Sequence, residues 1–198
     1  MTLIDEISVL LRAGLSKFGE VGIAVSGGSS PVKLYEGLSS LDLDWMRVHV
    51  TLVDDRLVPA DHFDSNQKLV QRTLLRGRAR MAKFTRLQDW QAGRFPDIAI
   101  LGMGTDGHFA SLFPAMIDDE RAFGLAADPA VITTDPMGNP FYARITMNLS
   151  MILAIPNRVL MVVGEEKKAV LSAALNGADL PITRLLAHNG TQISYERI

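Results

Sequence analysis

The feature of this sequence that most constrains its fold is a series of short apolar segments separated by segments with helical periodicity. The apolar segments lie at residues 21–25, 48–53, 97–101, 142–146 and 159–163. We interpret them as strands covered on both faces, which lack a regular alternation of apolar and polar residues. Apolar residues recur at helical spacing in 3–18, 32–38, 66–75 and 165–175. This order predicts an α/β protein with a doubly wound, mostly parallel sheet and helices on both faces.

The composition is that of a chain that can bury a core without covalent cross-links. Its 198 residues are 47% hydrophobic, and no internal repeat divides them, so we expect a single domain spanning 1–198. The absence of cysteine excludes thiol catalysis, cysteine-ligated metals and disulfides, and it fits a reducing compartment, so we expect a cytoplasmic protein. Asp5 and Glu6 stand where a signal peptide would carry bases, and no apolar run could span a bilayer. We therefore expect neither export nor a membrane partner.

The charge balance argues against a polyanionic partner. Twenty basic residues against 22 acidic ones give a net charge of -2, which indicates no nucleic acid partner. The densest basic run comprises Arg76, Arg78, Arg80, Lys83 and Arg86, and we interpret it as a solvated face. An anionic substrate would need positive charge gathered locally.

Ligands of a doubly wound sheet bind beyond the carboxyl ends of its strands, so we expect the functional residues in the loops after the predicted strands. The first such loop is Ser26-Gly27-Gly28-Ser29-Ser30-Pro31. Its glycines allow close approach of the backbone to a ligand, its serines offer hydroxyls and a helix cap, and Pro31 suits the first helical position. Exposed amides at such a helix start could bind a phosphate. The alternative is a tight strand-to-helix turn without a ligand.

The second loop contains Asp54-Asp55-Arg56, and Asp64-Ser65-Asn66 opens the helix that follows. Two carboxylates beside a guanidinium at a strand end must either pair with it or take part in function. An internal salt bridge with a helix cap at Asp64 or Ser65 would explain them equally well, so this loop alone predicts no function.

The third loop, residues 101–114, is the most informative part of the sequence. Gly102, Gly104 and Gly107 surround Asp106 and His108, which suggests a tightly folded backbone that directs one imidazole into a cleft. A lone histidine is more often structural, but flanking glycines at a strand end favour a functional one.

Two later cations complete the set of candidates. Arg144 lies within the fourth predicted strand, and Lys167 lies near the start of the last predicted helix. Each could be an ordinary surface charge. A phosphate site would nevertheless need both, since arginine can bind phosphate oxygens in pairs.

Together these segments resemble the 6-phosphogluconolactonases, in the superfamily that also contains the glucosamine-6-phosphate deaminases. The resemblance rests on five motifs in the family's order, at 26–31, 54–66, 102–114, 144–146 and 164–167. It implies the Rossmann-like fold shared with sugar-phosphate deaminases and isomerases. It also implies hydrolysis of 6-phospho-D-glucono-1,5-lactone in the oxidative pentose phosphate pathway, with no metal and no organic cofactor.

The resemblance also implies roles for individual residues. His108 would be the general base on water, and Asp106 would support the histidine loop. The substrate and its phosphate would be bound by Ser26, Gly27, Gly28, Ser29, Ser30, Asp54, Arg56, Arg144 and Lys167. One position departs from the family, which usually has Asp-Glu-Arg where this chain has Asp54-Asp55-Arg56, so the role of the shorter Asp55 stays open.

Two other functions compete with this one. A glucosamine-6-phosphate deaminase or isomerase shares the serine-glycine loop and the Asp-Gly-His element but typically continues toward Asn-Glu-Pro, whereas residues 110–114 here read Ala-Ser-Leu-Phe-Pro. A non-catalytic sugar-phosphate sensor normally carries a DNA-binding helix-turn-helix, for which the sequence before Val21 leaves no room. We therefore expect a lactonase, monomeric or a small homo-oligomer, whose partner is a phosphorylated sugar lactone.

Overall fold

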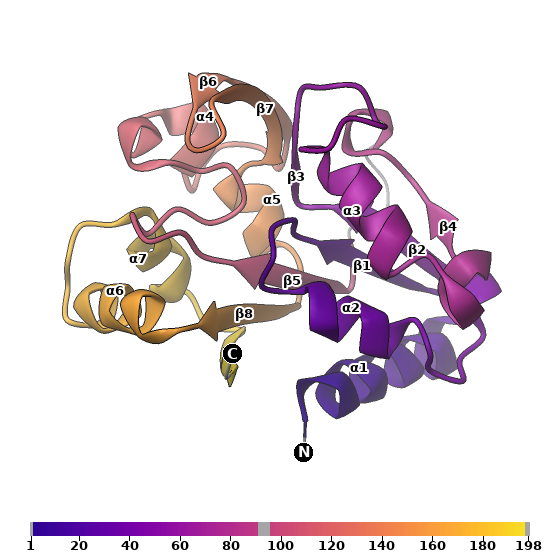
Figure 1. Ribbon diagram of the computed structural model, residues 1–198. Coiled ribbons are helices and arrows are strands. Elements are labelled where there is room, and N and C mark those ends of the chain that lie inside the picture. Colours follow the sequence, from indigo (N-terminus) through magenta and orange to yellow (C-terminus); the bar gives the residue numbers. More distant parts are fainter. Residues whose placement is uncertain (1, 91–95, 197–198) are drawn as a thin grey trace.

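The computed structural model describes residues 2–90 and 96–196, and its framework is a parallel sheet (Figure 1). The strand order is β4-β2-β1-β5-β8-β9, and every neighbouring pair is parallel. The strands are β1 (Val21–Val25), β2 (Val48–Leu52), β4 (Lys83–Phe84), β5 (Ile98–Gly102), β8 (Asn157–Val163) and β9 (Thr191–Glu196). The predicted fold class is confirmed.

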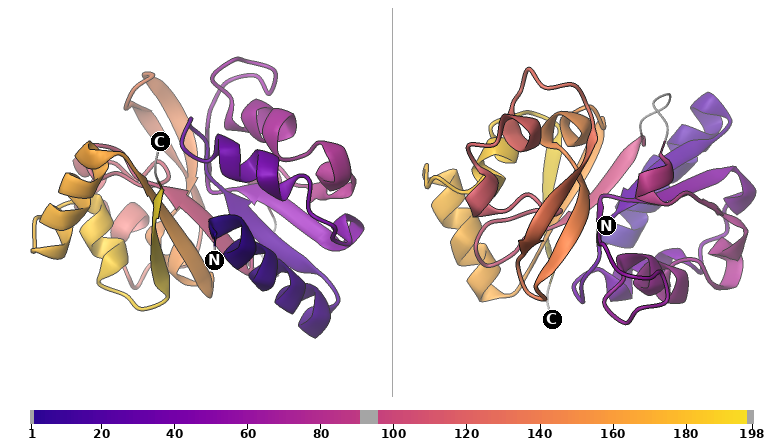
Figure 2. Two further views of the ribbon diagram at one scale, coloured as in Figure 1. Left: turned by 60° about the horizontal axis from the view of Figure 1, so that its bottom comes forward. Right: turned by 90° about the horizontal axis from the view of Figure 1, so that it is seen from above.

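Helices cover both faces of this sheet. On one face, α1 (Leu3–Phe18), α2 (Val32–Leu38) and α3 (Asn66–Thr73) share a core with strand residues such as Ile23. On the other, α5 (Leu149–Leu153), α6 (Glu165–Leu175) and α7 (Pro181–Leu186) share a core with residues such as Ala24. Figure 2 shows α6 and α7, in yellow, at the end of the molecule opposite α1 to α3.

The continuous apolar character of the central strands follows from this double cover. Successive residues of a strand point to opposite faces, so Ile23 enters one core and Ala24 the other. Burying a large apolar side chain stabilises the fold by about 1.5–3 kcal/mol. Both faces of β1 therefore have to be apolar, which is why all five of its residues are buried.

The prediction that residues 142–146 join the parallel sheet is wrong. They belong to β7 (Tyr142–Met147), the centre of a separate antiparallel sheet with β3 (Asp54–Arg56) and β6 (Val131–Met137). Ile145 and Met147 enter a core, whereas Arg144 lines a pocket. Residues of β7 thus alternate between a face in the core and a face at the pocket. The five residues considered in the sequence were too few, and too mixed in composition, to show this alternation.

Several elements were not predicted because they are short or polar. They include β3, β4, β6 and β9, the helices α5 and α7, and α4 (Glu120–Phe123). Short 3-10 turns lie at Trp45–Arg47, Gly77–Met81, Leu87–Asp89 and Pro114–Met116. Pro31 lies at the N-cap of α2, one residue before the predicted position, and no side chain caps that helix. The basic run from Arg76 to Arg86 is exposed at all five of its cations, as predicted.

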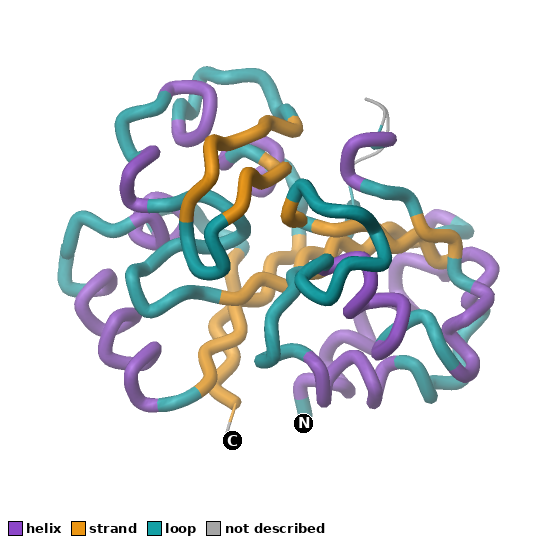
Figure 3. The backbone as a smooth tube through the Cα atoms, turned by 45° about the horizontal axis from the view of Figure 1, so that its top comes forward, coloured by secondary structure: helices purple, strands orange, loops and turns teal. Residues whose placement is uncertain are grey.

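The arrangement of the two sheets determines where a ligand could bind. The carboxyl ends of β1, β2 and β5 meet at one edge of the parallel sheet, and β3 continues from β2 into the antiparallel sheet. Figure 3 shows the β6–β7 hairpin lying over the loops at this edge. Within the described residues, no helix is long and apolar enough to cross a membrane.

Candidate active site

A pocket of about 230 Å³ lies at the carboxyl ends of β1, β2 and β5, beneath the β6–β7 hairpin. It brings together nearly all the residues that the sequence proposed for the site. Those that line it are Ser26, Gly27, Gly28, Ser29, Ser30, Asp54, Arg56, His108, Arg144 and Lys167. Asp106 does not line the pocket but contacts His108 from behind.

The imidazole of His108 is held by the carboxylate of Asp106. One oxygen of Asp106 lies 2.5 Å from Nδ1 of His108 and also accepts a hydrogen bond from the main-chain N–H of His108 at 3.2 Å. Burial raises the pKa of Asp106, but its hydrogen bonds with His108 and the charge of that residue outweigh burial, so the pKa lies below its usual value. The ring also contacts Phe113, with 4.7 Å between the centroids, and its side chain is 31% exposed. The histidine is therefore oriented but accessible.

The glycines of this loop are required by its close packing. A Cβ atom on Gly104 would lie 2.2 Å from the ring of His108 and 2.6 Å from the carboxylate of Asp106. Gly107 has φ +81°, a conformation that favours glycine. The N–H of Gly104 donates to the carbonyl of His108 at 2.8 Å and closes the loop. The position of the imidazole therefore depends on a turn that needs glycine at 104 and 107, because a side chain at 104 would displace the ring.

The serine-glycine loop packs directly against the start of α3. A Cβ atom on Gly27 would lie 1.8 Å from the side-chain oxygen of Asn66, so only glycine fits. The next residue, Gly28, has φ +86° and open space around its Cα. These two residues expose main chain to the pocket, as the sequence predicted.

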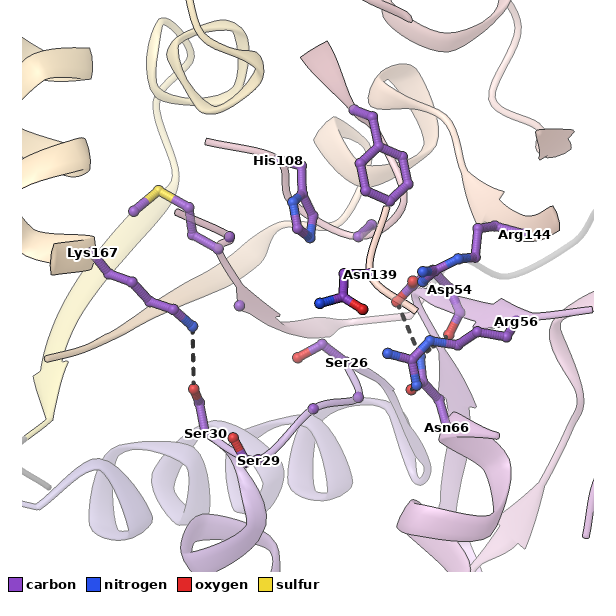
Figure 4. Close-up of a pocket in the computed structure, with 17 residues that line it drawn as sticks. Ser26, Ser29, Ser30, Asp54, Arg56, Asn66, His108, Asn139, Arg144 and Lys167 are labelled. Atoms are coloured by element: carbon purple, nitrogen blue, oxygen red, sulfur yellow. Dashed lines mark hydrogen bonds between the residues drawn. The ribbon is translucent and has the colours of Figure 1, made fainter. Parts of the chain in front are cut away.

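The three cations of the pocket lie on opposite sides of it. Figure 4 shows Lys167 and Ser30 on one side and Arg56 and Arg144 on the other, with His108 above the space between them. Nζ of Lys167 donates to the hydroxyl of Ser30 at 3.4 Å. Burial lowers the pKa of Lys167, and burial followed by the charge of Arg56 lowers the pKa of Arg144. Nearby carboxylates act in the opposite direction, Glu166 on Lys167 and Asp54 on Arg144, but burial has the largest effect on both cations, and a bound anion would stabilise their charged forms.

The two arginines are held by oxygen atoms of the protein. Arg56 donates to the carbonyl of Asp64 at 2.6 Å and to the side-chain oxygen of Asn66 at 2.9 Å. Arg144 donates to the carbonyls of Pro140 and Tyr142 at 2.6 and 3.3 Å. The sequence left open a salt bridge between an aspartate and Arg56 in the 54–56 loop. Within the described residues, Arg56 instead donates to neutral oxygen atoms of Asp64 and Asn66.

The adjacent aspartates at 54 and 55 have different surroundings. Asp54 lines the pocket, and its carboxylate accepts the hydroxyl of Ser111 at 2.5 Å and the amide of Asn66 at 3.4 Å. Asp55 faces away and accepts main-chain N–H groups of Arg56, Asn66 and Gln67 at 2.6 to 3.1 Å. Burial raises the pKa of Asp55, against the effect of those bonds. Asp55 therefore caps the start of α3, together with Ser65, which accepts the N–H of Lys68 at 3.3 Å.

The sequence did not single out every residue of the pocket. Additional lining residues are Asn66, Gly102, Met103, Gly104, Ala110, Phe113 and Asn139. Asn66 belongs to the second motif of the family resemblance, although the sequence assigned it no role in binding. Asn139 carries no local signal, since the β6–β7 hairpin brings it over the pocket (Figure 4). Among the described residues, no group of three or more histidine, cysteine or acidic side chains is placed to hold a metal ion.

Comparisons with known proteins show which proteins this chain is similar to. A 6-phosphogluconolactonase of Neisseria meningitidis is 36% identical over 208 aligned positions, covering 96% of this chain and 90% of that protein. One from Helicobacter pylori is 38% identical, covering 93% of this chain and 86% of its own. The crystal structure of a 6-phosphogluconolactonase from Shewanella baltica superimposes with a TM-score of 0.88 at 33% identity, covering 98% and 91% of the two chains.

The match to a family extends over almost the whole chain. The family described as glucosamine-6-phosphate isomerases/6-phosphogluconolactonase matches residues 1–194, which include all five motifs and the full pocket. The chain therefore belongs to the glucosamine-6-phosphate isomerase/6-phosphogluconolactonase family.

Proposed function

We propose that the chain hydrolyses 6-phospho-D-glucono-1,5-lactone to 6-phospho-D-gluconate, a reaction of the oxidative pentose phosphate pathway. The observation that carries the proposal is the oriented His108–Asp106 pair in a pocket that also holds three cationic side chains. The names of the relatives support it, and so does Ala-Ser-Leu-Phe-Pro at 110–114.

In this proposal His108 is the general base. The carboxylate of Asp106 is ionised at neutral pH, as an aspartate ordinarily is, and can only accept a hydrogen bond, so Nδ1 of His108 carries the proton. Nε2 then keeps a lone pair for a water molecule. A neutral imidazole in a fixed tautomer is suited to removing a proton from water near neutral pH.

The cations and the serine-glycine loop act on the phosphate. Arg56, Arg144 and Lys167 provide charge, and the main chain around Gly27 and Gly28 provides N–H groups. Because the phosphate is remote from the ester, its binding serves to place the lactone carbonyl beside His108. Asp54 cannot contact a dianion favourably, so its place in the pocket is better explained by the hydrogen bonds it accepts from Ser111 and Asn66.

The reaction then balances without any other group. Water forms a bond to C1 as its proton passes to Nε2 of His108, and the electron pair of the carbonyl moves onto oxygen. When the carbonyl re-forms, the bond from C1 to the ring oxygen breaks, and that oxygen takes the proton from the imidazolium. The open-chain acid leaves, and the histidine is again neutral.

The proposal extends to the oligomeric state, the domain organisation and the location of the protein. We propose a monomer or a small homo-oligomer, and the pocket that this one chain forms is the support. One core includes residues of both sheets, such as Leu101 of β5 and Met147 of β7, which supports a single domain over 1–198. We also propose a cytoplasmic location, for which the lack of cysteine is the support.

A lactone hydrolysis assay tests the proposal. Freshly generated 6-phosphogluconolactone is offered to the protein with and without a chelator, and the rate is corrected for spontaneous opening. We expect turnover that the chelator leaves unchanged. A parallel assay follows ammonia release from glucosamine 6-phosphate. Ammonia release without lactone turnover would replace the proposed activity with that of a deaminase, and loss of turnover with the chelator would contradict a mechanism without a metal.

A further inference from the structure

The hydroxyl of Ser26 is a buried polar group without a hydrogen-bond partner among the residues that the structure describes. Ser26 is 6% exposed and lies on the lining of the active-site pocket. Polar atoms that are buried without a partner destabilise a fold, and each needs an explanation. The position of this one in a pocket indicates that its partner is a bound ligand.

The main chain of Ser26 is fixed on both sides. Its N–H donates to the carbonyl of Ile100 at 3.1 Å, and its carbonyl accepts the hydroxyl of Tyr35 at 2.6 Å. Its hydroxyl lies beside Gly102, where a Cβ atom would be 3.8 Å from Oγ of Ser26, in ordinary van der Waals contact. The fold therefore fixes the main chain that carries this hydroxyl before any substrate arrives, and transition-state stabilisation requires donors whose positions are fixed in advance.

Ser26 lies between the cationic side chains on the two sides of the pocket, not among them (Figure 4). Figure 4 shows it on the floor of the pocket, between Lys167 on one side and Arg144 on the other, with His108 on the opposite wall. Three cationic side chains of the pocket are already available to a phosphate. The hydroxyl of Ser26 is then available to an oxygen of the lactone ester, which the bound phosphate places beside His108.

We propose that the hydroxyl of Ser26 donates a hydrogen bond to the lactone carbonyl oxygen as that oxygen becomes an oxyanion, an inference that rests on the proposed function. The water deprotonated by His108 attacks C1 from the side of the imidazole. The carbonyl oxygen, which receives the electron pair as the new C–O bond forms, lies to the side of the line of attack and faces the floor of the pocket. Ser26 donates to it there and is unchanged when the carbonyl re-forms and the ring oxygen leaves.

The variant Ser26→Ala tests this role, and Thr51→Val is its matched control. The hydroxyl of Thr51 is likewise buried and unpartnered within the described residues, but it lies in β2 and does not line the pocket. Removing either unpartnered hydroxyl should leave the melting temperature equal to or above that of the wild type. For Ser26→Ala we expect kcat to fall by about 10²–10³-fold, with KM and the Kd for 6-phosphogluconate changed by less than roughly threefold. For Thr51→Val we expect unchanged turnover.

Each other result has a definite meaning. An increase in KM at unchanged kcat would assign Ser26 to a non-reacting part of the substrate and overturn the oxyanion role. A lower melting temperature in Ser26→Ala, with Thr51→Val unchanged, would show that the hydroxyl is structural. If the wild type hydrolyses the lactone and Ser26→Ala does so equally well, only this inference fails. If the wild type has no lactonase activity, the proposed function fails as well.

Discussion

The hydroxyl of Ser111 donates a 2.5 Å hydrogen bond to the carboxylate of Asp54, across 57 residues of sequence. Ser111 follows His108 by three residues on the same loop, and Asp54 begins β3 at the end of β2. The second oxygen of Asp54 accepts the amide of Asn66, whose own oxygen accepts from Arg56. One buried carboxylate therefore connects the histidine loop to an arginine on the opposite side of the pocket.

The variant Ser111→Ala should disturb both ends of this connection. It removes a donor from the buried carboxylate of Asp54, and hydrogen bonds to charged groups stabilise proteins by about 1.5–3 kcal/mol. We expect a loss of that order in the free energy of unfolding, measured in urea, together with lower kcat and higher KM. The control Ser40→Ala removes an exposed hydroxyl and should change neither. If Ser111→Ala lowered stability with normal kinetic constants, the bond would be structural alone.

The variant His108→Asn tests the base. Asparagine keeps a polar side chain of similar reach but cannot take a proton from water, so we expect kcat to fall by about 10²–10⁴-fold with little change in product binding. The matched control is His188→Asn, because His188 does not line the pocket. Steady-state kinetics and product titrations make the comparison. Turnover near that of the wild type in His108→Asn would remove the imidazole from the mechanism.

The parallel sheet could be predicted because double burial leaves a signal in the sequence. Residues 21–25 enter two cores in turn and therefore contain no polar residue. The same rule missed β3, since Asp54, Asp55 and Arg56 are polar and their strand pairs only with β7. It misplaced β7, because a short strand with one core face and one pocket face resembles a buried strand when only a few residues are considered.

The sequence could predict those site residues that lie in the loops directly after the parallel strands. The carboxyl ends of neighbouring parallel strands meet at one edge, so Ser26 after β1 and His108 after β5 had to lie close together. Asn139 could not be predicted in this way, because its position depends on a hairpin in another sheet. The difference between Asp54 and Asp55 was also hidden, since neighbouring strand residues point to opposite sides and sequence does not say which side is the pocket.

The lowered pKa of Lys167 predicts a pH dependence of ligand binding. Burial lowers this pKa, and a bound phosphate would raise it, because the charged form gains a partner. Binding of 6-phosphogluconate should therefore be strongest at pH values where free Lys167 is protonated. As pH rises through the lowered pKa, short of about 10.4 for an ordinary lysine, affinity should weaken and proton uptake on binding should appear. Calorimetry in two buffers of different ionisation enthalpy measures both quantities.

The variant Lys167→Arg provides the comparison, since a guanidinium stays protonated throughout this range. Its affinity for the product should be nearly independent of pH on the alkaline side, even where the altered geometry weakens binding overall. An alkaline decrease of equal size in both proteins would assign the effect to another group and would exclude Lys167 as its source.

The variant Gly27→Ala tests the contact between the serine-glycine loop and Asn66. The new methyl group would lie 1.8 Å from the side-chain oxygen of Asn66, so this oxygen, which accepts a hydrogen bond from Arg56, must shift. Overpacking of this kind costs about 1–3 kcal/mol, which should appear in the free energy of unfolding. Because Arg56 also loses an acceptor that positions it, KM for the phosphorylated lactone should increase.

A second glycine separates crowding from backbone strain. Gly177 has φ +91° with open space around its Cα and lies outside the pocket, so Gly177→Ala is strained but uncrowded. It should lower stability by about 1 kcal/mol and leave KM unchanged. If Gly27→Ala matched Gly177→Ala in both measurements, the methyl group would not displace Asn66, and the dependence of Arg56 on that contact would have to be abandoned.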